Sequence, residues 1–246
     1  MMRVFAGLFT VVVLLPGALW GQAPARSSVD MVKQVATMRA KLADWPQLSY
    51  YREANAELPA AAAGQDRVVF FGASVAEFWG KRGGQFFPGK PYINRGIGGQ
   101  TSAQMLVRFR QDVIHLHPVA VVFLESTNDI SQEMEPEMSE DNWESIAELA
   151  KANGIRMILT SITPSSHFPW NPGLHPAETI RTRNVWLKEY AATHSLTYVD
   201  FDPVLANAEG GMKAELTVDG VHPNKEGYAA MAPLVQAAID KTLAGK

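Results

Sequence analysis

Residues 67–74 read RVVFFGAS, an apolar run that ends in Gly-Ala-Ser. An unbroken apolar run of this length is typical of a strand that is buried on both faces of a parallel sheet. Runs of the same kind recur along the chain, at residues 119–124, 155–162 and 196–201, and a shorter one covers residues 91–94. We therefore predict a parallel sheet of roughly five strands.

The segments between these runs have the periodicity of amphipathic helices. Their apolar residues recur three and four positions apart, as at Met105, Phe109 and Val113. The pattern covers residues 101–117, 138–153, 177–193 and 225–243. Regular alternation of strand and helix predicts an α/β fold with a doubly wound sheet. In such folds the ligand binds at the carboxyl ends of the strands, so the residues that follow each strand are the first candidates for function.

The composition is that of an ordinary globular protein. The 246 residues include 22 Lys and Arg against 25 Asp and Glu, which gives a net charge of −3. Because the basic residues form no cluster, we expect no nucleic-acid partner. The chain has no Cys, which excludes disulfides, thiolate metal sites and a cysteine nucleophile.

The first 25 residues have the pattern of a signal peptide. A basic residue, Arg3, precedes an apolar stretch at residues 4–15, and small residues follow as far as Ala25. A membrane anchor would need about 20 apolar residues, whereas Pro16 interrupts this stretch after about a dozen. We expect export to the periplasm or the medium, with cleavage after Gly21 or after Ala25 and no membrane span afterwards.

The rest of the chain is long enough for one α/β domain, which we assign to residues 65–246. Residues 26–64 form a helical lead-in, because Met31, Val35 and Met38 have helical spacing. We thus divide the chain into a signal peptide at residues 1–25, a lead-in at residues 26–64 and an α/β domain at residues 65–246.

Glycine-rich or polar blocks follow the predicted strands. Ser74 comes after the first strand, and Gly99 lies in the turn NRGIGGQT after the second. Asn128 follows the third strand, and Asp219 and His222 are three positions apart before the last helix. Taken singly, each residue has a simpler structural explanation, such as a helix cap, a tight turn or a buried histidine.

Together, these blocks supply the parts of a serine hydrolase. A serine hydroxyl is the nucleophile, and an Asp-x-x-His turn supplies a general base with the carboxylate that orients it. A glycine N–H and an asparagine amide can stabilise the negative charge that develops on the substrate oxygen. Because parallel strands end at one edge of the sheet, we expect all of these groups to meet there.

In these blocks the chain resembles the SGNH hydrolase superfamily, also called GDSL esterases and lipases. It is most similar to secreted bacterial members of the platelet-activating-factor acetylhydrolase type. The resemblance covers residues 67–246, with FGAS, NRGIGGQT, STND and DGVHP in the family order. It implies a three-layer α/β/α, flavodoxin-like fold and no metal or cofactor. The site residues that it implies are a catalytic Ser74, Asp219 and His222, and an oxyanion hole formed by Ser74, Gly99 and Asn128.

Two positions depart from the family pattern. Ala73 stands where the first block has Asp, and Ser126 stands where the third block has Gly. The first change removes a hydrogen-bonding group beside the nucleophile. The second restricts the backbone if that position needs a positive φ. We expect both changes to affect the rate more than the mechanism.

The resemblance implies a secreted serine esterase that hydrolyses short-chain esters, acetyl esters above all, of small molecules or carbohydrates. Phe168 and Trp170 lie in a predicted loop and are available to stack on a sugar or an acyl group. Glu125 follows a buried strand, where it could contact the substrate or pair with Arg95. Two alternatives stay open: an acyltransferase that moves the acetyl group to a carbohydrate, and a weakly active carbohydrate-binding descendant.

Overall fold

The computed structural model describes residues 28–62, 64–82, 85–125 and 127–245. The chain divides into two units, residues 1–43 and residues 44–246, so the predicted lead-in at 26–64 spans their boundary. In the first unit the described part is one helix, α1 (Ser28–Ala43). The predicted signal peptide and Ser126 lie outside the described residues.

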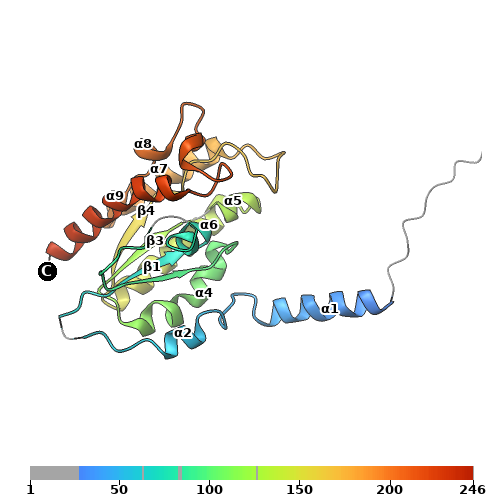
Figure 1. Ribbon diagram of the computed structural model, residues 1–246, viewed down its shortest axis with the longest axis horizontal. Helices are drawn as coiled ribbons and strands as arrows, with labels where there is room; N and C mark the ends of the chain where they lie inside the picture. Colours follow the sequence, from blue (N-terminus) through green and yellow to red (C-terminus); the bar gives the residue numbers. More distant parts are fainter. Residues whose placement is uncertain (1–27, 63, 83–84, 126, 246) are drawn as a thin grey trace, which may run out of the picture. The chain divides into compact units, whose positions relative to one another are not determined.

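The second unit is built on a five-stranded sheet whose strands are all parallel (Figure 1). Their order across the sheet is β2-β1-β3-β4-β5. In chain order they are β1 (Val68–Gly72), β2 (Tyr92–Gly96), β3 (Ala120–Leu124), β4 (Arg156–Thr160) and β5 (Thr197–Val199). Each strand overlaps one of the apolar runs, so the predicted parallel α/β sheet is confirmed.

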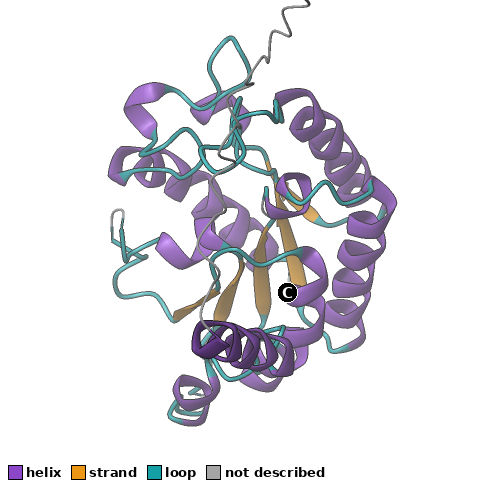
Figure 2. Cartoon of the chain, turned by 90° about the vertical axis from the view of Figure 1, so that its right-hand side faces the viewer, coloured by secondary structure: helices purple, strands orange, loops and turns teal. Residues whose placement is uncertain are grey.

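Helices connect the strands and cover both faces of the sheet (Figure 2). The four predicted helices between and after the strands are present, with shorter helices beside them. In chain order they are α2 (Arg52–Ala56), α3 (Ser74–Phe78), α4 (Ser102–Asp112), the 3-10 helix η1 (Ile114–Leu116), α5 (Asn128–Ser131), α6 (Pro136–Ala152), α7 (Ala177–Thr193), α8 (Asp202–Leu205), the 3-10 helix η2 (Ala214–Leu216) and α9 (Lys225–Ala244).

Alternate residues of a strand point to opposite faces of the sheet, and each face has its own apolar core. In β1, Val69 and Phe71 belong to the core that includes residues of α4, α6 and α7. Val68 and Phe70 belong to the core that includes residues of α3, α8 and α9. All four side chains are fully buried, which explains why the run is apolar without alternation. The result is the three-layer α/β/α arrangement that the resemblance implies.

Strands β4 and β5 are shorter than their apolar runs, and a side chain of α7 explains the end of β4. The Ser161 backbone N–H still donates to the Val199 oxygen at 2.8 Å. At the next residue, the backbone N–H of Ile162 donates instead to Asn184 Oδ1 at 2.8 Å, and Asn184 Nδ2 donates to the Ile162 oxygen at 3.1 Å. An amide side chain therefore takes the place of a neighbouring strand.

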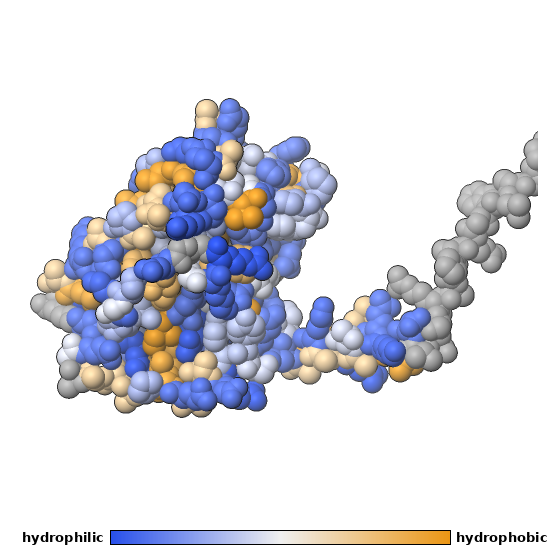
Figure 3. All heavy atoms as spheres, in the orientation of Figure 1, coloured by the Kyte–Doolittle hydropathy of each residue, from blue (hydrophilic) through white to orange (hydrophobic). Residues whose placement is uncertain are grey.

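No helix in the described part of the chain is both long and apolar enough to cross a membrane. The face drawn in Figure 3 carries mostly hydrophilic residues, with separate small hydrophobic patches among them.

Candidate active site

Ser74, His222 and Asp219 form a continuous chain of hydrogen-bonding side chains. Ser74 Oγ lies 2.9 Å from His222 Nε2, and His222 Nδ1 lies 2.7 Å from Asp219 Oδ2. Ser74 and His222 are 148 positions apart in the sequence, so the fold alone brings them together. The side chain of His222 is 16% exposed and Ser74 is half-buried, which leaves both within reach of a substrate.

Ser74 is the first residue of α3 and follows β1 after one residue. Two side chains from other elements hold this short helix. Asn94 of β2 donates from Nδ2 to a main-chain oxygen of α3 at 2.5 Å, and the hydroxyl of Tyr228 in α9 donates to the Val75 oxygen at 2.9 Å. Because α9 begins shortly after His222, the second contact ties the segment of the histidine to the helix of the serine.

A tight turn before α9 orients Asp219 and His222. Asp219 Oδ1 accepts hydrogen bonds from the backbone N–H groups of Val221 at 3.0 Å and of His222 at 2.8 Å. Burial by itself raises the pKa of Asp219, but the hydrogen bonds from His222 and Val221 outweigh it, so this pKa lies below its ordinary value. Asp219 is therefore ionised at neutral pH, as is needed to stabilise a protonated imidazole.

The turn after β2 approaches both Ser74 and the loop that carries Asn128. Gly99 has a φ of +79°, in the left-handed region that favours glycine. Its neighbour Gly98 faces Ser74, since a Cβ added at Gly98 would lie 3.7 Å from the Cβ of Ser74. On the other side, Asn128 Nδ2 donates to the Gln100 oxygen at 2.8 Å. The turn that contains Gly99 thus contacts the loop of Asn128 and lies beside Ser74 through Gly98.

This geometry is accompanied by a match to a known family. Residues 60–230 match the GDSL-like lipase/acylhydrolase family. The chain belongs to this family. The family and the relatives below indicate an ester hydrolase.

This chain aligns with nearly the whole length of two solved structures. One is a protein from Bacteroides fragilis described as an acylhydrolase, 44% identical with a TM-score of 0.78, over 81% of this chain and 99% of that one. The other is a GDSL-like lipase from Bacteroides thetaiotaomicron, which is 38% identical with a TM-score of 0.76. The match covers 80% of this chain and 98% of that one. Esterase TesA of Pseudomonas aeruginosa is 28% identical over 131 residues, which are 53% of this chain and 60% of that esterase.

A buried arginine of α4 supports the loops of this GDSL-family site. The guanidinium of Arg108 donates to the main-chain oxygens of Gly72 and Arg95, both at 2.8 Å, at the ends of β1 and β2. It also donates to the side-chain oxygen of Gln100 and lies 3.2 Å from Asp112 Oδ2. Burial lowers the pKa of Arg108 to about 10, against the raising effect of Asp112, so the group stays cationic at neutral pH.

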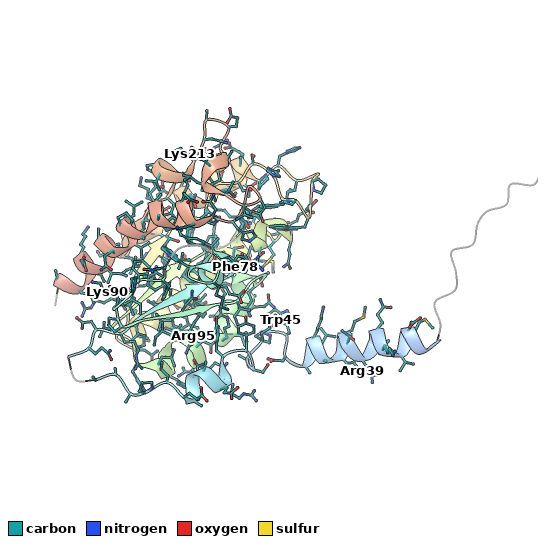
Figure 4. All side chains as sticks on the ribbon, in the orientation of Figure 1. Arg39, Trp45, Phe78, Lys90, Arg95 and Lys213 are labelled. Carbon is teal, nitrogen blue, oxygen red and sulfur yellow. The ribbon has the colours of Figure 1, made fainter. Side chains whose placement is uncertain are left out.

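Aromatic side chains flank the histidine of this GDSL-family chain. The ring centroids of Phe78 and Trp170 lie 5.2 Å and 6.1 Å from that of His222 (Phe78 is labelled in Figure 4). Trp170 is 51% exposed, and its Nε1 donates to Ser131 Oγ at 2.6 Å. Phe168 is fully buried and stacks on Trp170 at 5.4 Å. Of the two residues predicted to stack on a substrate, Trp170 presents a ring to solvent and Phe168 supports that ring.

The other residues that the sequence singled out are buried. Glu125 directly follows β3 and is 2% exposed. Arg95 is also buried and donates from Nε to Asn55 Oδ1 at 2.7 Å. Ala73 is fully buried between β1 and α3. Within the ranges that the structure describes, no three His, Asp or Glu side chains are grouped so that they could hold a metal ion.

The sequence analysis did not single out Arg108, Glu77 or Tyr50, although all three support the loops around Ser74. For Arg108 a signal exists, because it shares the apolar face of its helix with Met105, and a charged residue on a buried face is unusual. Glu77 and Tyr50 carry no such signal, since Glu77 is half-buried, Tyr50 is exposed, and such residues are ordinary at such positions.

Proposed function

We propose that this protein is a serine esterase in which Ser74 is the nucleophile, His222 the general base and Asp219 the carboxylate that orients the imidazole. The observation that carries the proposal is the hydrogen-bonded chain, with 2.9 Å from Ser74 Oγ to His222 Nε2 and 2.7 Å from His222 Nδ1 to Asp219 Oδ2. A serine hydroxyl is a weak nucleophile until a neighbouring base takes its proton.

The reaction has two steps. In the first, His222 Nε2 takes the proton of Ser74 Oγ as the oxygen attacks the ester carbonyl carbon, and the carbonyl electron pair moves to the oxygen. When the tetrahedral intermediate collapses, His222 gives this proton to the departing alcohol and an acyl-serine remains. In the second step, His222 takes a proton from water as the water attacks the acyl-serine, and it gives this proton to Ser74 Oγ as the second tetrahedral intermediate collapses. The free acid leaves and the Ser74 hydroxyl is restored.

The negative oxygen of each tetrahedral intermediate requires donors that are already in position. We assign this role to the backbone N–H groups of Ser74 and Gly99 and to one N–H of the Asn128 amide. The other N–H of that amide donates to the Gln100 oxygen, which fixes the plane of the amide. Each donor of this kind contributes about 10²- to 10³-fold to the rate.

We propose short-chain acyl esters, acetyl esters in particular, of small molecules or carbohydrates as substrates. The exposed ring of Trp170 beside His222 supports this choice, because an indole face suits both sugar rings and small apolar groups. Rates on p-nitrophenyl acetate, butyrate and octanoate, and on glucose pentaacetate, test it. Equal rates on the acetyl and octanoyl esters would contradict a short-chain preference.

Hydrolysis of p-nitrophenyl acetate by the wild type and by Ser74→Ala tests the mechanism. We expect the variant to lose at least about 10³-fold in kcat/KM. Its melting temperature should stay close to that of the wild type. The matched control is Ser195→Ala, at an exposed serine after α7, which should keep full activity. Turnover retained in Ser74→Ala would refute the assignment.

We also propose that residues 1–25 direct export and are then removed. The basic residue followed by a short apolar stretch and small residues supports this. When the full chain is produced in a bacterial host, intact mass should show a periplasmic protein that begins at Gln22 or at Arg26. Recovery of only the full-length chain, inside the cytoplasm, would contradict export.

A further inference from the structure

The turn after β2, which carries the proposed oxyanion donor Gly99, contains two adjacent glycines, Gly98 and Gly99. Glycine has the largest backbone freedom of any residue, so a donor N–H on a Gly-Gly turn points in a fixed direction only if the turn is held from outside. A donor that must be oriented during the reaction loses much of its electrostatic benefit. The groups that hold this turn therefore contribute to the rate of ester hydrolysis.

Glu77 holds the turn at Gly98. Its Oε2 accepts a hydrogen bond from the Gly98 backbone N–H at 2.7 Å. A Cβ added at Gly98 would lie 2.9 Å from the same oxygen, so a larger residue there would require the Glu77 carboxylate to shift. Because Glu77 and Ser74 belong to the same short helix, α3, one element carries both the nucleophile and the support of the turn.

Tyr50 holds Glu77 from the other side. The hydroxyl of Tyr50 donates to Glu77 Oε1 at 2.5 Å, and Lys81 Nζ donates to the same oxygen at 3.1 Å. Burial raises the pKa of Glu77, but the hydrogen bonds from Tyr50, Gly98 and Lys81 outweigh it, so the pKa falls below its ordinary value. The carboxylate is ionised, and its bond to the Gly98 N–H is charge-assisted and correspondingly strong.

Further contacts come from the same segment of chain. The hydroxyl of Tyr51 donates to the Gly96 oxygen, and Gln100 Nε2 donates to the Pro46 oxygen at 2.8 Å. Residues 46–51 therefore contact the turn region both before and after the two glycines. The segment precedes residue 60, where the match to the family begins. In Figure 4 the label Trp45 stands at the residue that directly precedes this segment, and the label Arg95 stands at strand β2.

We propose that Glu77, held by Tyr50, is a positioning residue that fixes the Gly98-Gly99 turn, so that the Gly99 N–H is aimed at the oxyanion. The lead-in residues 46–51 thereby act as a brace of the active site. The proposal rests on the proposed esterase function. It extends that function to residues outside the region that matches the family.

The test compares four variants of the full chain with the wild type on p-nitrophenyl acetate. We expect Glu77→Ala to lower kcat about tenfold to 100-fold with little change in KM, because the support acts only in the transition state. Tyr50→Phe should lower kcat about threefold to tenfold, by loosening Glu77. Glu77→Gln should restore most of the loss, since its amide oxygen can accept from the Gly98 N–H and its NH₂ can donate to Tyr50.

Lys81→Met is the matched control. It removes the other partner of Glu77, a lysine that is 57% exposed, and should change kcat less than about twofold. Melting temperatures show whether each variant is folded. If Glu77→Ala does not fold, Tyr50→Phe and Glu77→Gln decide the question.

The outcomes separate this proposal from the esterase assignment. If the wild type shows turnover that depends on Ser74 and Glu77→Ala keeps its kcat, the positioning role is wrong and the esterase stands. A folded Glu77→Gln as slow as Glu77→Ala would also overturn it, because the hydrogen bond to Gly98 would then not be what matters. If the wild type has no turnover that depends on Ser74, both proposals fail.

Discussion

The side-chain amide of Asn128 donates a 2.8 Å hydrogen bond to the main-chain oxygen of Gln100. This bond joins the loop after β3 to the loop after β2, across the strand β1 that leads to Ser74. The two loops therefore cannot move independently beside the serine. One N–H of the Asn128 amide donates to this main-chain oxygen, and the bond fixes the plane of the amide. The direction of the second N–H is then fixed as well, which is the condition for a preorganised oxyanion donor.

Replacing Asn128 by Ala should lower kcat about 10²- to 10³-fold and leave KM within about threefold, because the interaction is made in the transition state. Steady-state kinetics on p-nitrophenyl acetate measure both. Asn153→Ala is the control, since it removes an amide hydrogen bond to the main-chain oxygen of Leu149 at an exposed position after α6. A raised KM with unchanged kcat would assign Asn128 to substrate binding.

Asp219 should make stability depend on pH. Its pKa in the folded state lies below the ordinary value near 3.9, so its contribution is complete above that value and disappears as the pH falls through the folded pKa. The difference in free energy of unfolding between the wild type and Asp219→Asn should thus favour the wild type at pH 7 and shrink below about pH 4. Urea unfolding at pH 7 and pH 3 measures it.

Asp240→Asn, at a surface carboxylate of α9, is the control for this experiment. It should be as stable as the wild type at both pH values. A difference for Asp219→Asn that stays constant from pH 7 to pH 3 would mean that its hydrogen bonds do not favour the charged form.

Arg108 should be essential for stability. Its side chain is fully buried, and Arg108→Met would leave the buried carboxylate of Asp112 without its cation. We expect a loss of about 3–5 kcal/mol in the free energy of unfolding. Arg110→Met, at an exposed position of the same helix, should change it by less than about 0.5 kcal/mol. Equal effects of the two changes, measured by urea unfolding, would show that burial of Arg108 is not what matters.

Trp170 and Phe168 should separate substrate binding from folding. Trp170→Ala removes an exposed ring, and we expect KM for glucose pentaacetate to rise about threefold to tenfold with little change in melting temperature. Phe168→Ala removes a fully buried ring and should cost about 3–5 kcal/mol of stability. If KM is unchanged in Trp170→Ala, the sugar or acyl group does not contact this ring.

Much of the fold, and the order in which the site residues follow the strands, could be predicted from the sequence alone. The apolar runs at β1, β3 and β4 are explained by burial on both faces of the sheet, which leaves a pattern in the residues themselves. The pair Asp219 and His222 is local, so its spacing of three positions already predicts contact. The approach of Ser74 to this pair follows from a topological rule, because parallel strands end at one edge.

The tertiary structure decided which polar groups meet. The hydrogen bonds of Glu77 with Tyr50 and Gly98, and those of Arg108 with the ends of β1 and β2, join segments that are distant in sequence. The burial of Phe168 beneath the exposed Trp170 is of the same kind. Periodicity records which side of an element faces the core, but such contacts depend on side-chain conformations and on the packing of loops, which leave no periodic trace in the sequence.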